Sequence, residues 1–446
     1  MKKAILTAAF ALVLCSGSLL AANKDEVKTG WNVGPLPAVG YSSDKGLQYG
    51  VTCDFFYFGD GSTYPTYRHK FATEISHYTK GDTRAHIFYD SSYLIPGLRV
   101  SGAITYVNSP LFPFYGFNGL EQYDAEYNLN KNHMVLGQAV PVTNYNFSRD
   151  MLRVLADVQG EIPAVPHLRW AAGMSFWYFS IKDIDTDKYG YNTGASLYNV
   201  YQSVGLIEEA DANGGSRLEM KAGLTYNSRD KEADPSKGIW AELYLNGSPD
   251  LFGDGYSYLK LCAHFRNYIP IIPDNGLTFA YHLAYQGTVA GEAPFYIQSN
   301  ITALYLKQII SEGLGSDTTV RGALYNRFIG NDYAWANFEM RIKLVSFRFI
   351  NQSWYVSTNP FFDMGTVLRP YRAEQMADYL SVLYQDGHLW TADDVAKQAR
   401  QLHCSAGLGI KLIMNQNFVI AVEAAKAFNA NDNPGLGMRI GLNYIF

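Results

Sequence analysis

The chain has 446 residues and a formal net charge of -5, with 48% hydrophobic, 15% aromatic and only 17% charged residues. Soluble domains usually carry about 25% charged residues, so this composition argues against a cytosolic enzyme. The mean hydropathy of -0.13 is too low for a helical membrane protein, and no long apolar run follows residue 22. Because no basic cluster is present, nucleic acid is not expected as a partner.

Residues 1–22 are typical of a secretory signal peptide. Lys2 and Lys3 precede an apolar run, and the small residues Ala21 and Ala22 mark the expected cleavage position. Cys15 is only a poor match to a lipoprotein cleavage box. Removal of the signal would leave three cysteines in distant segments, Cys53, Cys262 and Cys404. This odd number argues against a disulfide framework.

The mature chain, residues 23–446, alternates apolar and polar residues over segments of about ten residues, and this pattern predicts a transmembrane β-barrel. Asn337, Glu339, Arg341 and Lys343 form one such polar row. A buried soluble core could not hold this row without dedicated pairing, so we expect a polar lumen. Sixteen strands are predicted: 36–42, 46–58, 69–79, 83–94, 98–107, 148–157, 168–181, 216–227, 239–247, 256–267, 276–288, 332–347, 352–366, 404–414, 417–427 and 435–446.

The lengths of the connections support an even number of antiparallel strands. If the first strand runs outward from the periplasm, all of the longest connections lie on the extracellular side, as is usual for such barrels. These connections are 108–147, 182–215, 289–331 and 367–403. The fold class is therefore an all-β, sixteen-stranded antiparallel barrel with a long sixth extracellular loop.

One segment, residues 371–402 in the seventh extracellular loop, breaks the alternation and predicts a helical hairpin. Thr391 and Asp394 have the spacing of a helix cap, and Asp386 with Gly387 supplies a turn. The hairpin could cover the barrel mouth or meet a partner. It could equally be a folded loop of no special function.

The last predicted strand, 435–446, places Leu436, Met438, Ile440, Leu442, Tyr444 and Phe446 on its outward face. With Tyr444 and the terminal Phe446, this strand resembles the β-signal by which outer-membrane barrels are recognised for insertion. The alternative is a soluble edge strand that happens to end in phenylalanine.

The sixth loop contains Val320, Arg321 and Gly322, and the next two strands carry Glu339 and Asp363 on their inward rows. These residues resemble the BamA and TamA family of outer-membrane proteins, the bacterial surface antigen family. The resemblance implies that the loop tip folds back inside the barrel and that Arg321 meets Glu339 and Asp363 on the wall. Arginine suits this role because it pairs bidentately with carboxylates and keeps its charge.

A second match to the same family lies upstream, in residues 224–230 followed by 235–239. The sequence also departs from the family pattern. Ala323 stands where an aromatic residue usually follows the tip glycine. The first predicted strand begins within about 15 residues of the expected cleavage site, so we expect a barrel-only member without POTRA domains.

The resemblance implies a role in outer-membrane protein assembly or translocation. The mechanism would depend on weak closure between the first and last strands, where Gly437 and Gly441 reduce packing. The implied partners are outer-membrane lipid, client barrel proteins and a periplasmic protein that supplies a POTRA-like domain. The alternative is a passive pore or a structural surface protein.

An enzyme is the least supported class. His403 and Ser405 have the His-x-Ser spacing of the outer-membrane phospholipase barrel, whose pair faces lipid, but no matching asparagine can be identified. The other histidines show no metal-ligand spacing, and no glycine-rich phosphate loop follows a strand. The sequence therefore predicts no catalytic residues, no metal and no cofactor.

Overall fold

The computed structural model describes residues 27–64, 67–129, 134–135, 138–139, 143–185, 195–273, 276–305, 309–315, 317–349, 352–384, 388–414, 418–442, 444 and 446. The predicted signal peptide, residues 1–22, and the predicted turn at Asp386 and Gly387 lie outside the described residues. The three mature cysteines Cys53, Cys262 and Cys404 are all free thiols.

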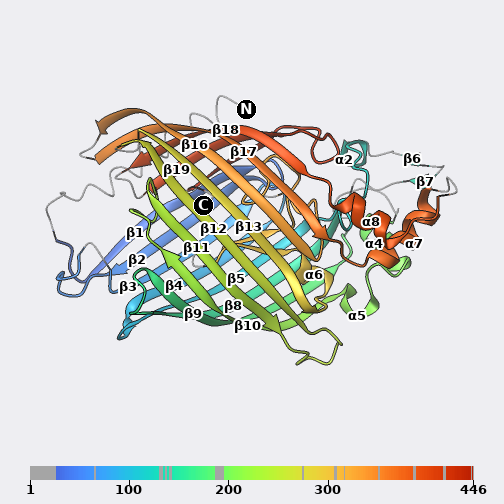
Figure 1. Ribbon diagram of the computed structural model, residues 1–446, viewed down its shortest axis with the longest axis horizontal. Helices are drawn as coiled ribbons and strands as arrows, with labels where there is room; N and C mark the ends of the chain where they lie inside the picture. Colours follow the sequence, from blue (N-terminus) through green and yellow to red (C-terminus); the bar gives the residue numbers. More distant parts are fainter. Residues whose placement is uncertain are drawn as a thin grey trace.

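Sixteen strands form one closed barrel, and each strand runs antiparallel to its neighbours (Figure 1). The prediction of a sixteen-stranded antiparallel barrel is confirmed. In order around the barrel the strands are β1 (Trp31–Ser42), β2 (Gly46–Tyr57), β3 (His69–Tyr78), β4 (Thr83–Ile95), β5 (Leu98–Pro113), β8 (Asn146–Glu161), β9 (Leu168–Lys182), β10 (Gly214–Asn227), β11 (Gly238–Ser248), β12 (Tyr258–Ile272), β13 (Leu277–Gly291), β16 (Asp332–Phe349), β17 (Gln352–Arg369), β18 (His403–Met414), β19 (Phe418–Ala427) and β20 (Gly437–Leu442).

The two faces of the wall differ as the alternation predicts. Outward residues such as Val51 and Leu344 are exposed, whereas the inward Asn337, Glu339 and Arg341 are buried. An apolar outer surface and a polar interior are the pattern of a barrel that sits in lipid. None of the helices among the described residues is long and apolar enough to span a membrane.

The four longest connections gather at one end of the barrel, and the helices lie in them (Figure 1). They hold α2 (Glu126–Leu129), α4 (Leu197–Ser203), α5 (Glu209–Ala212), α6 (Phe295–Gln298), α7 (Ala373–Tyr384) and α8 (Ala392–Ala399), with the short strand pairs β6 (Met134–Val135) with β7 (Gln138–Ala139) and β14 (Asn300–Leu304) with β15 (Ile309–Glu312). In the seventh connection, the Thr391 side chain accepts a hydrogen bond from the Asp394 amide, and the Asp394 side chain accepts one from the Thr391 amide. These two bonds cap the N-terminus of α8.

An aromatic cluster fills this end of the barrel. Counted at this end only, the third, fourth, sixth and seventh connections meet here; they join β5 to β8, β9 to β10, β13 to β16 and β17 to β18. Phe114, Phe117, Tyr201 and Tyr371 are each at most 1% exposed and belong to one hydrophobic cluster. Asn118 ties the third connection to the seventh, because it donates to the Tyr371 carbonyl at 2.9 Å and accepts from the Tyr371 amide at 2.7 Å. The long loops therefore pack as one apolar cap.

The other feature that positions the site is the seam between β1 and β20. β1 pairs with β2 over its whole length, but among the described residues it pairs with β20 only at Tyr41 with Ile440 and Ser42 with Arg439. The Ser43 amide donates to the Met438 carbonyl at 3.1 Å just beyond these pairs. The first and last strands are therefore joined only at the end that carries the long loops.

The prediction that Tyr444 and Phe446 continue the outward face of the last strand is wrong. β20 ends at Leu442, and both aromatic side chains are buried inside the barrel. The Arg341 guanidinium lies 3.8 Å from the Tyr444 ring centroid, and its Nη2 donates to the Phe446 carbonyl at 3.0 Å. This cation on the inner wall attracts the aromatic end of the chain into the lumen. Their role as a β-signal stays a prediction.

Candidate functional site

The tip of the sixth connection lies inside the barrel, against the inner faces of β16, β17 and β19. After the β14 and β15 hairpin, the chain continues to Val320 and Arg321, which are 1% and 4% exposed. The Thr319 carbonyl accepts a hydrogen bond from Asn337 Nδ2 on β16 at 2.6 Å. Asn337 therefore helps to fix the loop just before its arginine.

Arg321 contacts both wall carboxylates that the family resemblance implies. Its Nε and Nη2 donate to Asp363 Oδ2 and Oδ1 at 2.7 and 2.8 Å, and its backbone amide donates to the same carboxylate at 3.0 Å. Its Nη1 donates to Glu339 Oε1 at 2.6 Å. The bidentate geometry uses the planar guanidinium fork, which a lysine could not reproduce.

A third carboxylate, Glu423 on β19, was not identified from the sequence. Its Oε1 lies 3.2 Å from Arg321 Nη1 and 3.2 Å from Lys411 Nζ on β18. Its neighbours in the inward row, Ala421 and Ala425, are small and buried. A single glutamate among small inward residues is the signal that could have marked it, because such a charge needs a partner from elsewhere in the lumen.

Glycines let the tip approach the wall closely. Gly322 has a φ of +91°, and a Cβ there would lie 2.8 Å from the Ala425 Cβ. A Cβ on Gly365 would lie 2.8 Å from the Val320 side chain, and one on Gly437 of β20 would lie 2.7 Å from the Gly322 Cα. Gly437 was expected to reduce packing at the seam, but in the structure it makes room for the loop tip.

The aromatic contact of the tip comes from the wall. The Arg321 guanidinium carbon lies 3.5 Å from the centroid of the Phe361 ring on β17. Ala323, which stands where the family pattern has an aromatic residue, is itself buried. The cavity left around the tip is only about 20 Å³. Because a single water needs about 10–15 Å³, the cluster is nearly dry.

The cluster extends to the last strand of the barrel through Arg439 on β20. Arg439 Nη1 lies 3.4 Å from Glu423 Oε2, and its Nε lies 3.8 Å from Asp317 Oδ2 in the sixth connection. Glu423 therefore bridges Arg321 and Arg439. The loop tip and the strand that forms the seam share one ion network.

The phospholipase pattern would require His403 and Ser405 to face lipid, but they do not. Both side chains are buried inside the barrel, and His403 Nδ1 lies 2.9 Å from Asp432 Oδ2. The His403 ring packs against Phe328 of the sixth connection at a centroid distance of 3.9 Å. The interior position follows from strand parity, because Ser405 is in register with the inward Asp363.

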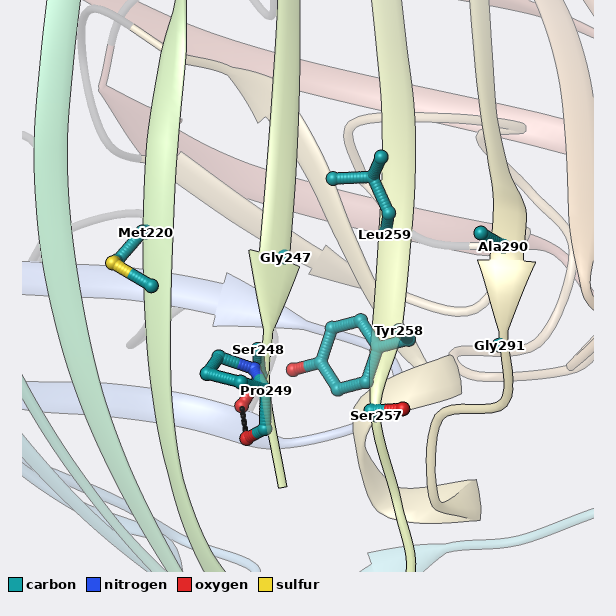
Figure 2. Close-up of a pocket in the computed structure, with 9 residues that line it drawn as sticks. All are labelled: Met220, Gly247, Ser248, Pro249, Ser257, Tyr258, Leu259, Ala290 and Gly291. Atoms are coloured by element: carbon teal, nitrogen blue, oxygen red, sulfur yellow. Dashed lines mark hydrogen bonds between the residues drawn. The ribbon is translucent and has the colours of Figure 1, made fainter. Parts of the chain in front are cut away.

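A depression of about 380 Å³ lies on the barrel wall near the ends of β11, β12 and β13 (Figure 2). Met220, Gly247 and Leu259 are in register on β10, β11 and β12, so that the glycine forms a low point between two larger side chains. The residues that line it include no carboxylate, histidine or basic side chain. We therefore place the candidate site at Arg321.

Residues 98–444 match the Omp85 superfamily domain. The chain belongs to the Omp85 superfamily. The match includes the loop tip, its three wall carboxylates and the last strand, so the candidate site lies within the family domain. None of the curated proteins matches the chain in sequence.

Two solved structures show the same fold. BamA from Haemophilus ducreyi lacking POTRA domains 1-3 is 15% identical with a TM-score of 0.57, and the match covers 93% of this chain and 70% of that one. CdiB from Escherichia coli is 10% identical with a TM-score of 0.54, and the match covers 93% of this chain and 62% of that one. The family and the barrel fold place this protein in the bacterial outer membrane.

Proposed function

We propose that this Omp85-superfamily barrel assembles or translocates polypeptides at the outer membrane, and that the seam between β1 and β20 is its moving part. The observation that carries the proposal is the ion network of Arg321, Glu423 and Arg439, which joins the loop tip to the last strand. A loop held in this way can sense or restrain the position of β20.

The shortness of the seam supports a moving role. A ladder with two paired residues on each strand contributes only a few hydrogen bonds, and each is worth about 0.5–1.5 kcal/mol net. Neighbouring strands make far longer ladders: β1 pairs with β2 over twelve residues. If the barrel opens sideways, the seam is where the least backbone pairing among the described residues is lost.

On the β1 side of the seam, the inner wall of β2 and β3 is more accessible than that of β8. Lys70 and Asp54, which face the lumen from β3 and β2, retain 24% and 29% side-chain exposure. Arg153 and Asp157 on β8 are buried. The inner wall beside β1 therefore keeps some solvent contact on the β2 and β3 side, where a polypeptide could be accommodated.

A passive pore is the second candidate. Its support is the charged inner wall, but the aromatic cluster at the loop end opposes it, because Phe114, Phe117 and Tyr371 are fully packed there. Single-channel recording in planar bilayers separates the two functions. A pore would conduct steadily without any partner, whereas an assembly protein would co-purify with client barrels or with a periplasmic protein that supplies a POTRA-like domain.

The decisive experiment is depletion of this protein in its host, followed by quantitative proteomics of isolated outer membranes. Selective loss of other barrels or of surface proteins supports the proposal, and an unchanged outer-membrane proteome contradicts it. Complementation with Arg321→Ala, next to the exposed-arginine control Arg169→Ala, would show whether the loop-tip network is required.

A further inference from the structure

A cavity of about 460 Å³ lies at the loop end of the barrel, beside the joined part of the seam. Asp44 of the turn between β1 and β2 lines it from one side of the seam, and Asn433 and Leu436 of the connection before β20 line it from the other. Ser43, which also lines it, donates its amide across the seam to the Met438 carbonyl at 3.1 Å. Small-molecule sites usually occupy about 300–1,000 Å³, so one ligand could contact both sides of the seam here.

Tyrosine rings form an aromatic wall of this cavity. In the third connection, the ring centroids of Tyr115 and Tyr123 each lie 5.2 Å from that of Tyr145, and all three residues line the cavity. Tyr325 of the sixth connection adds a fourth ring, whose centroid lies 4.5 Å from Lys45 Nζ. The face of an aromatic ring is electron-rich, so it favours contact with the polarised C–H groups on the flat side of a sugar ring.

The charged groups of the lining balance one another. Among the described residues that line the cavity, the charged side chains are two lysines, Lys45 and Lys80, and two aspartates, Asp44 and Asp82. Lys45 Nζ lies 3.7 Å from Asp82 Oδ2, and Lys80 Nζ donates to the Ser43 carbonyl at 2.8 Å. An anionic ligand would need an excess of cations, so this balance favours an uncharged polar ligand.

Sugar hydroxyl groups match the hydrogen-bonding capacity of this lining. Carboxylates only accept hydrogen bonds, ammonium groups only donate them, and amide side chains such as that of Asn146 do both. A hydroxyl group also does both, so a ligand that carries several can pair with every polar group of the mixture. Aromatic faces and mixed polar groups together therefore indicate a saccharide.

We propose that this cavity binds a sugar unit of a glycan at the cell exterior, and that the bound sugar bridges the two sides of the seam. The long loops of such barrels face outward, where the glycan can belong to an outer-leaflet lipid or to a free polysaccharide. Asn433 links the cavity to the loop tip, because its Nδ2 donates to the Gly322 carbonyl at 2.8 Å. An occupied cavity therefore holds the β1–β2 turn, the connection before β20 and the tip together. The inference does not rest on the proposed function.

The test uses the full chain in amine-oxide micelles, because maltoside detergents carry a sugar headgroup that could occupy the cavity. The probes are the oligosaccharides released from the surface of the native bacterium by mild acid, and intact lipopolysaccharide from the same cells. We expect saturable binding of the released oligosaccharides in titration calorimetry. Additional binding of lipopolysaccharide identifies the outer leaflet as the source, and binding of the released oligosaccharides alone identifies a free glycan. Binding of neither probe, or of lipopolysaccharide alone, overturns the proposal.

Tyr123 offers a matched pair of variants. Tyr123→Ala should weaken oligosaccharide binding by up to about tenfold, because it removes a stacking surface, whereas Tyr123→Phe keeps the ring and should bind like wild type. Tyr384→Ala removes a tyrosine of α7 that does not line the cavity and should also bind like wild type. The folded band on unboiled gels shows that each variant forms the barrel. Equal affinities of Tyr123→Ala and Tyr384→Ala contradict the assignment of the aromatic wall.

Amide hydrogen exchange of the wild-type protein tests the bridging of the seam without any variant. At an oligosaccharide concentration of about ten times Kd, the Ser43 amide should exchange up to about tenfold more slowly, because a ligand that binds only the closed seam suppresses its opening by mass action. The Leu168 amide, which donates to the Val165 carbonyl in the turn between β8 and β9, should not change. Unchanged exchange at Ser43 in the saturated complex means that the sugar does not bridge the seam. Neither result depends on the proteomic outcome, so the two hypotheses can fail separately.

Discussion

Replacement of Arg321 by alanine tests the candidate site most directly. The variant leaves Asp363, Glu339 and Glu423 without the cation that contacts all three. Glu339 keeps Arg341 and Glu423 keeps Lys411, but Asp363 loses its cation. Removing one partner of a buried ion pair costs about 3–5 kcal/mol, because the charge that remains is buried and uncompensated. The small cavity of about 20 Å³ around the tip leaves space for about one water, so solvent does little to reduce this cost.

The expected shift in melting temperature follows from the size of the chain. The unfolding entropy of about 2.1 cal/mol/K per residue gives a change of about 1 °C per kcal/mol for 446 residues. Arg321→Ala should therefore melt about 3–5 °C lower than wild type. Thermal unfolding in detergent, followed by circular dichroism and by the loss of the folded band on unboiled gels, measures this shift.

The matched control is Arg169→Ala, which removes an exposed ion pair with Glu161. Such pairs contribute at most about 1 kcal/mol, so this variant should melt within about 1 °C of wild type. Adding Asp363→Asn to Arg321→Ala should recover part of the loss, because one unpaired charge is removed. If Arg321→Ala and Arg169→Ala melt at the same temperature, the buried-network reasoning is refuted.

Three further predictions follow from the same region. Gly322→Ala should lower stability by about 1–3 kcal/mol in chemical unfolding, since its φ of +91° strains an alanine and the wall leaves no room; Gly205→Ala, with a φ of +74° and open space around it, shows the strain without the clash. Burial raises the pKa of Asp44, in the turn after β1, to about 6. The protonated form is therefore favoured in the folded protein, and its stabilisation is lost as the pH rises from about 4 through 6. Asp44→Asn should raise the melting temperature at pH 8 and leave it nearly unchanged at pH 4; the opposite pH dependence would contradict this assignment. Arg439→Gln should increase proteolysis near β20, as measured by limited digestion, and unchanged digestion would mean that the network does not hold the strand.

The barrel itself could be predicted because alternation is a local property. Each strand shows its two faces in its own sequence, and the even number follows from closure. The end of the last strand could not be predicted in this way. Tyr444 and Phe446 continue the alternation, but their position depends on Arg341, about a hundred residues earlier, which attracts them into the lumen.

The candidate site, too, could be predicted from the sequence only in part. Arg321, Glu339 and Asp363 were identified from a resemblance to a family. Glu423 is marked only as a lone glutamate among small inward residues, and Arg439 only by an inward position in its strand. Their role depends on which inward residues lie at the same depth in the closed barrel. Depth is set by the register between strands, and alternation excludes a one-residue slip but is unchanged by a slip of two residues.

The contacts of β20 show what holds the seam closed. Its two register pairs with β1 contribute roughly 1–3 kcal/mol, which is less than the cost of disrupting the buried network. Gly437 meets Gly322 of the tip backbone to backbone, and Arg439 joins the Glu423 cluster. Because β20 pairs with β1 at only two of the described residues, the strand is restrained more by the loop tip inside the barrel than by its neighbour across the seam. A client or partner that displaces the tip would therefore loosen β20 without having to break a continuous sheet.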